Sequence, residues 1–111
     1  MASAPDQQIE ASVYSNVELT SSTDPQVVTA GVEGKSLFIS AISISTDTEQ
    51  SVKIISDGGE ILVANKYLPA SSVWSKSFII PVSAMVRGEG VKVVCSTDSG
   101  NVTVDLEGYY R

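Results

Sequence analysis

Residues 91–108 read VKVVCSTDSGNVTVDLEG, and this stretch decides the fold class. From Val102 to Glu107 apolar and polar residues alternate, which is the pattern of a strand buried on one face only. The apolar run Val91–Ser96 comes before it, across a short polar connection at 97–101. This order predicts a β-hairpin.

Outward from this hairpin, short β signals separated by turn-forming residues fill most of the chain. The strongest is Leu37–Ser45, where the apolar positions change parity near Ser40 and Ala41, which predicts a β-bulge or burial on both faces. No long amphipathic helix pattern separates the signals, so parallel βαβ units are disfavoured. We therefore predict an all-β fold, an antiparallel β-sandwich or jelly roll of about seven or eight strands. Besides the hairpin and Leu37–Ser45, the expected strands are Gln26–Ala30, Val52–Ser56, Ile61–Leu68 and Val73–Ile80.

The first 25 residues differ from the rest. Residues 1–8 are polar with a proline, and residues 21–25 form a loop signal that ends in a proline. Between them, Val17 and Leu19 alternate with polar residues as in a strand, while the spacing of Ile9, Val13 and Val17 also fits a short helix. We expect an extended N-terminal arm over 1–25 and a β-sandwich domain over 26–111. The apolar anchors of this arm on a neighbouring protein would be Ile9, Val13, Tyr14, Val17 and Leu19.

The charge of the chain excludes some partners. Its 111 residues carry a net charge of −6 with only seven lysines and arginines, so nucleic acids and anionic membrane surfaces are not expected partners. Residues 1–60 hold nine acidic and two basic residues, whereas 61–111 hold four acidic and five basic. This asymmetry is either a matter of solubility, or it lets an acidic face meet a neutral or basic face on a neighbouring copy.

Catalytic and metal-binding residues are scarce. The sequence contains no histidine, which removes the usual general base and the commonest metal ligand. Its one cysteine, Cys95, is expected to be a small buried residue in a strand. The acidic residues Asp47, Glu49 and Asp98 do not have the spacing of a dedicated calcium loop. We predict that the protein is not an enzyme and binds no cofactor or metal.

The N-terminus has neither the charged region nor the apolar run of a secretory signal. No apolar run reaches the roughly 20 residues of a membrane helix. The sequence therefore predicts a protein made in a cytoplasm and not secreted by a signal peptide.

A few aromatic residues are candidates for protein contacts, because tyrosine, tryptophan and arginine are favoured in interfaces. Tyr67 and Trp74 flank the connection between two expected strands, and the chain ends in Tyr109, Tyr110 and Arg111. The alternative interpretation places Trp74 in the core and the last three residues at a strand end. A second hypothesis is a glycan- or ligand-binding module, in which Tyr67 and Trp74 form an exposed platform.

Three motifs in the last two-thirds of the chain resemble another group of proteins. They are the connection Tyr67-Leu68-Pro69-Ala70-Ser71-Ser72, the turn and strand Gly88-Glu89-Gly90-Val91-Lys92-Val93, and the closing strand Asn101–Tyr110. In this order they resemble the small β-sandwich virion proteins of tailed bacteriophages.

The resemblance implies a structural role in a virus particle. It favours a capsid decoration or cement protein that binds the major capsid protein or another virion protein, as a homo-oligomer and preferably a trimer. A head-to-tail connector or tail component is the alternative within the same class. Such proteins offer no catalytic residues to carry over.

Overall fold

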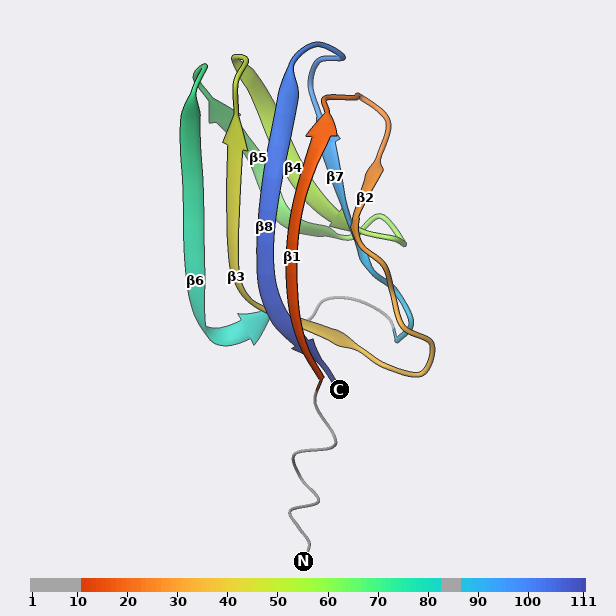
Figure 1. Cartoon of the computed structure of the whole chain (residues 1–111). Coiled ribbons are helices and arrows are strands. Elements are labelled where there is room, and N and C mark those ends of the chain that lie inside the picture. Colours follow the sequence, from red (N-terminus) through yellow and green to blue (C-terminus); the bar gives the residue numbers. More distant parts are fainter. Residues whose placement is uncertain (1–10, 83–86) are drawn as a thin grey trace, which may run out of the picture.

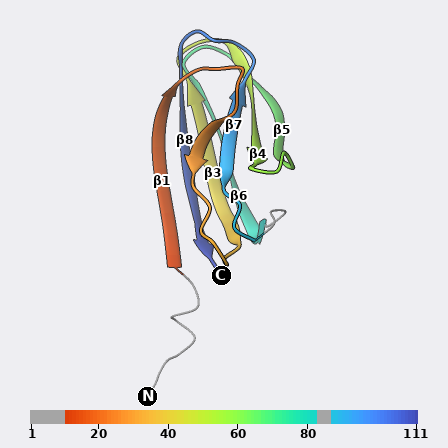
Figure 2. The same cartoon turned by 90° about the vertical axis from the view of Figure 1, so that its right-hand side faces the viewer.

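The computed structural model describes residues 11–82 and 87–111, and all its elements are β-strands. They form two four-stranded antiparallel sheets that pack face to face (Figures 1 and 2). The prediction of an all-β sandwich of seven or eight strands is confirmed. The strands are β1 (Ala11–Thr20), β2 (Gln26–Thr29), β3 (Leu37–Thr46), β4 (Gln50–Ser56), β5 (Ile61–Leu68), β6 (Ser72–Val82), β7 (Val91–Cys95) and β8 (Asn101–Tyr110).

The strand order is that of a jelly roll. One sheet has the order β1-β8-β3-β6 and the other the order β2-β7-β4-β5. The hairpin predicted within residues 91–108 is therefore wrong: β7 and β8 follow each other in the chain but lie in different sheets, and the connection between them crosses from one sheet to the other. The first strand pairs with the last, the second with the seventh, the third with the sixth and the fourth with the fifth. The chain thus resembles a long hairpin rolled up, so that β3 also meets β8 and β4 also meets β7.

The expected irregularity in β3 is a β-bulge. Its register with β8 and β6 shifts between Ile39 and Ala41. The inward residues are odd-numbered before the shift (Leu37, Ile39) and even-numbered after it (Ile42, Ile44), so one extra residue is needed to keep all four in the core. Gly108 pairs with Ile39 at this point, and a Cβ there would lie 2.1 Å from the carbonyl oxygen of Phe38. Glycine therefore permits β3 and β8 to approach at the bulge.

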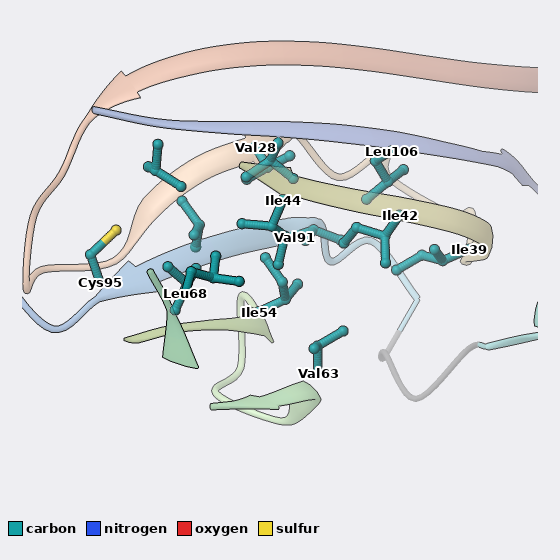
Figure 3. Close-up of a cluster of buried hydrophobic side chains, with 14 of the residues drawn as sticks. Val28, Ile39, Ile42, Ile44, Ile54, Val63, Leu68, Val91, Cys95 and Leu106 are labelled. Carbon is teal, nitrogen blue, oxygen red and sulfur yellow. The ribbon is translucent and has the colours of Figure 1, made fainter. Parts of the chain in front are cut away.

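The core lies between the two sheets and is built from aliphatic side chains (Figure 3). Cys95 is among them and is a free thiol, as expected. Burial raises the pKa of this thiol, although hydrogen bonds from Ser22 and Ser21 oppose the shift. The buried apolar residues are Val28, Leu37, Ile39, Ile42, Ile44, Val52, Ile54, Val63, Leu68, Val91, Val93, Cys95, Val102, Val104 and Leu106.

The N-terminal region differs from the expected arm over 1–25. Ala11–Thr20 is not an arm but the strand β1, paired with β8 residue by residue along its whole length. Its inward side chains, such as Val13 and Leu19, pack against the core of the same chain. The short helix considered for this segment is wrong, and β2 begins at Gln26 as expected. The first ten residues lie outside the described residues.

In the described residues, no helix has the length and hydrophobicity to cross a membrane.

Candidate protein-interaction surfaces

The outward side of the β1-β8-β3-β6 sheet is acidic. Pairing across the sheet places the outward residues Tyr14, Glu107 and Ala41 in one row, and Asn16, Asp105 and Ser43 in the next. The Asn16 amide donates a hydrogen bond to the Asp105 carboxylate. We call this side the acidic face, and its carboxylates are Glu18, Asp105 and Glu107.

Two shallow hollows lie on the acidic face. They form because the outward side chains of β3 and β6 are small, whereas those on the neighbouring strands are longer. One has a volume of about 250 Å³ and is lined by Tyr14, Ala41, Ile42, Ser43, Ser75, Lys76, Ser77, Asp105 and Glu107. The other, of about 340 Å³, is lined by Glu18, Ser45, Thr46, Asp47, Ser71, Ser72, Val73, Asn101 and Thr103.

One end of the sandwich is aromatic. Phe38 on β3 and Tyr109 on β8 are paired residues whose rings stack, with centroids 5.2 Å apart and planes at 8°. The strand β1 begins and β8 ends at the same end of the sandwich (Figure 1). We call the Phe38–Tyr109 pair with the backbone of Ala11 and Ser12 the aromatic end. Sequence reasoning missed Phe38, although the inward parity of Leu37 and Ile39 already places it outward.

Several predicted contact residues face the interior of their own chain. Val13 and Leu19 pack on the core from β1, and Val17 pairs with the fully buried Val104. Trp74 also packs against the core, with the Lys66 ammonium 5.5 Å from the centre of its ring. Tyr110 packs inward as well, and its hydroxyl donates to the carbonyl of Ala30 at 2.7 Å.

The remaining predicted residues are scattered. Tyr14 is 69% exposed on the acidic face. Arg111 is exposed, and its backbone pairs with Ser36 through two hydrogen bonds. Ile9 lies outside the described residues. Tyr67 pairs with Ser51 and faces outward from the other sheet, so it does not share a platform with the inward-facing Trp74.

The outward side of the β2-β7-β4-β5 sheet is apolar and basic at its centre. Lys53 pairs with Val94, and Ile55 pairs with both Lys92 and Ile61, all of them facing outward. The described outward positions of these four strands carry no acidic residue. We call this side the lysine face. Its outward apolar side chains include Val27, Ile55, Ile61, Tyr67 and Val94.

Acidic residues do flank the lysine face in the adjoining turns. Glu49 accepts a hydrogen bond from the Tyr67 hydroxyl, and this bond raises the pKa of Tyr67. Glu60 precedes Ile61. On the strands themselves, acidic and basic side chains are separated by sheet face. This separation does not follow the difference in charge between residues 1–60 and 61–111. Asp105 and Glu107 come from the second part and Lys53 comes from the first.

Asp47 ties two connections together beside the larger hollow. Its carboxylate accepts hydrogen bonds from the Asn101 backbone N–H at 2.8 Å, the Thr48 hydroxyl at 2.9 Å and the Asn101 side-chain amide at 3.1 Å. The bond from the Asn101 backbone is the main reason that the pKa of Asp47 is lowered. This carboxylate is a structural anchor between the β3–β4 and β7–β8 connections.

The described residues contain no group of three or more His, Cys, Asp or Glu side chains placed to hold a metal ion. The two sheet faces and the aromatic end carry exposed apolar side chains, single charges and a stacked ring pair. Such surfaces bind other macromolecules through shape and charge.

The fold is similar to that of one chain of the solved structure "Cyanophage Pam1 capsid asymmetric unit", with a TM-score of 0.52 and 13% sequence identity. The similarity covers 90% of this chain and 84% of that chain. No protein-family model and no curated protein matches the sequence. At this level of identity the likeness is one of fold, and jelly rolls serve many functions.

Proposed function

We propose that this protein is a structural component of a bacteriophage virion, and that it decorates or cements the capsid through protein–protein contacts. The observation that carries this proposal is the fold likeness to a chain of a phage capsid, which spans nearly the whole of both chains. The motifs around Tyr67–Ser72 and Gly88–Val93 support the same class. So does the amount of contact surface that this small sandwich presents.

The contact with the capsid is assigned to the aromatic end. The Phe38–Tyr109 pair is half-buried and already stacked, so its side chains lose little conformational freedom on binding. Aromatic residues with a polar tip are favoured as interface anchors. The partner is the major capsid protein or another virion protein, and a homo-oligomer, preferably a trimer, belongs to the same proposal.

Of the arm expected over residues 1–25, only residues 1–10 remain as a proposed contact with a neighbouring protein, because β1 begins at Ala11. Since β1 starts at Ala11 beside the aromatic end, a segment preceding it would leave the sandwich next to the proposed capsid contact. We assign residues 1–10 to contact with a neighbouring protein, with Ile9 as the apolar anchor. The other expected anchors of the arm lie in β1, where Val13, Val17 and Leu19 face the core and Tyr14 is exposed on the acidic face.

The test is binding of the purified protein to capsids that lack it, measured by co-sedimentation. We expect saturable binding, and Tyr109→Ala should weaken it by about tenfold or more, as loss of an interface anchor does. Tyr67→Ala is the matched control, because Tyr67 is 60% exposed on the lysine face. Absence of saturable binding would refute the decoration role, and equal effects of the two substitutions would refute the aromatic end as the contact.

The connector or tail role predicts a different result in the same experiment. A decoration protein saturates at a copy number set by the many equivalent positions on the capsid. A connector saturates at a few copies per particle, at one vertex. The number of copies bound at saturation therefore separates the two roles.

A further inference from the structure

We infer that the acidic face of one copy binds the lysine face of a second copy. The two faces lie on opposite sides of the sandwich and differ in charge. Glu18, Asp105 and Glu107 mark one, and Lys53 and Lys92 mark the centre of the other. This contact does not depend on the virion role. The acidic face and the Phe38–Tyr109 pair are on the same outward side of the sheet, since Tyr109 follows Glu107 by two residues on β8.

The charges on the two faces have matching separations. Asp105 and Glu107 are two residues apart on β8, which places them roughly 6.5–7 Å apart along the strand. Lys53 and Lys92 are diagonal neighbours on β4 and β7, since Lys53 pairs with Val94 and Ile55 pairs with Lys92. Diagonal neighbours lie roughly 7–8 Å apart. Each lysine can therefore meet one carboxylate when one face covers the other.

The apolar surfaces complement each other as well. Tyr14 stands 69% exposed beside Glu107, at the edge of the smaller hollow. On the lysine face, Ile55 and Val94 lie next to the two lysines, and Ile61 is 62% exposed. The hollow has small side chains at its base and can receive an aliphatic side chain from the opposing face. Burial of these groups adds to the attraction between the charges.

One cation on the acidic side and several acids in the turns beside the lysine face also contribute to the electrostatics of the contact. Lys76 lines the smaller hollow from β6, and its ammonium lies 5.6 Å from the ring centre of Phe78 at the open edge of the sheet. Glu49 lies at one end of the lysine face, beside Tyr67, and Asp57, Glu60 and Glu89 lie in the turns at the other end. The paired charges are therefore those at the centres of the two faces.

The geometry also predicts the form of the assembly. Opposite faces of a sandwich point away from each other, so this contact adds copies in an open row and does not close a ring. A closed trimer would use other surfaces. Because every copy carries a net charge of −6, copies repel at long range, and the association in solution is expected to be weak and dependent on concentration.

The experiment is sedimentation equilibrium of the full chain and two charge-reversed variants. The first variant carries Lys53→Glu and Lys92→Glu, and the second carries Asp105→Lys and Glu107→Lys. For the wild type we expect a weight-average mass that rises with concentration without reaching a plateau. Each variant alone opposes like charges at the contact, so its association should be at least about tenfold weaker.

Mixing the two variants provides the rescue. The reversed lysine face of the first then meets the reversed acidic face of the second, and the two native faces also match. A one-to-one mixture should therefore regain the wild-type association. This result also shows that both variants are folded.

The matched control is Asp24→Lys with Glu33→Lys, which changes the net charge as the second variant does, at exposed loop positions. It should associate like the wild type. A wild type that stays monomeric at all concentrations, a closed oligomer unaffected by either variant, or a mixture without rescue would each overturn the inference. None of these outcomes bears on capsid binding, which the co-sedimentation experiment measures separately.

Discussion

Ile44 and Ile61 are the same residue in opposite environments. Ile44 is 0% exposed at the centre of the core, while Ile61 is 62% exposed at the start of β5. Ile44→Ala should lower the free energy of unfolding by about 2–5 kcal/mol, because it removes buried apolar atoms and leaves a cavity. Ile61→Ala should change it by less than about 0.5 kcal/mol.

Urea unfolding of the two variants measures this difference. Equal losses of stability in the two would contradict the assignment of the inward and outward sides of the sheets.

The Asp47 carboxylate makes the stability of the fold depend on pH. Its pKa is lowered in the folded state, chiefly by the backbone N–H of Asn101. A carboxylate with a lowered pKa stabilises the fold above its unfolded pKa, and this contribution is lost as the pH falls through the folded pKa. Asp47→Asn should therefore be less stable than the wild type at pH 7.

The difference in stability between Asp47→Asn and the wild type should shrink steadily as the pH falls below about 4. Thermal unfolding across that pH range provides the measurement. A difference that is constant with pH would mean that the carboxylate charge does not contribute.

At the residue scale, sequence parity predicts much but not everything. It places Val102, Val104 and Leu106 inward correctly, because a strand buried on one face must alternate. The expected contact residues of the N-terminal region mixed both parities. Only Tyr14 of the described ones is on the surface, since the parity of a strand cannot be read before the segment is known to be a strand.

Gly108 on β8 allows the backbones of β8 and β3 to approach closely at the β-bulge. A Cβ at this position would lie 2.1 Å from the Phe38 carbonyl oxygen, and backbone atoms cannot easily yield. Gly108→Ala should cost about 3 kcal/mol or more, at the upper end for overpacked sites. The control is Gly34→Ala, which has no neighbour within 4 Å but a φ of +78°, and should cost about 1 kcal/mol.

Chemical unfolding of both glycine variants gives the comparison. If Gly34→Ala were the more damaging of the two, the close approach of β3 and β8 would not be the constraint.

Removing β1 should damage the sandwich. Deletion of residues 1–20 takes away the inward side chains of Val13 and Leu19 and exposes the edge of β8. An open strand edge of this length is a template for aggregation. We expect lower thermal stability and aggregation on size exclusion, whereas deletion of residues 1–10 retains β1 and the fold.

Equal stability of the two truncated proteins would argue that β1 is dispensable, as an arm would be.

At the element scale, the sequence predicts seven of the eight strands near their observed positions, because turn residues separate them and apolar residues recur within them. β1 was the exception. It is an edge strand with polar residues on its outward side, and its partner β8 lies some 90 positions further along the chain. The alternation of Val17 and Leu19 with polar residues fits a strand, but it does not tell whether that strand pairs within this sandwich or with a neighbouring protein, since its stability comes from that distant pairing.

At the scale of the whole molecule, the rolled topology brings together charges that the sequence separates. Glu18 from the first strand joins Asp105 and Glu107 from the last on one face, and Lys53 joins Lys92 on the other. The net charge of −6 could be known from composition, but the division of charge between two faces could not. It depends on which strands become neighbours, and that is a property of the fold.

The central claim is that this protein belongs to a virion. The most direct test is quantitative mass spectrometry of purified virus particles from cells that carry its gene. The proposal predicts that the chain is present in a fixed ratio to the major capsid protein and remains so through repeated purification. Particles that contain none of it would contradict the account.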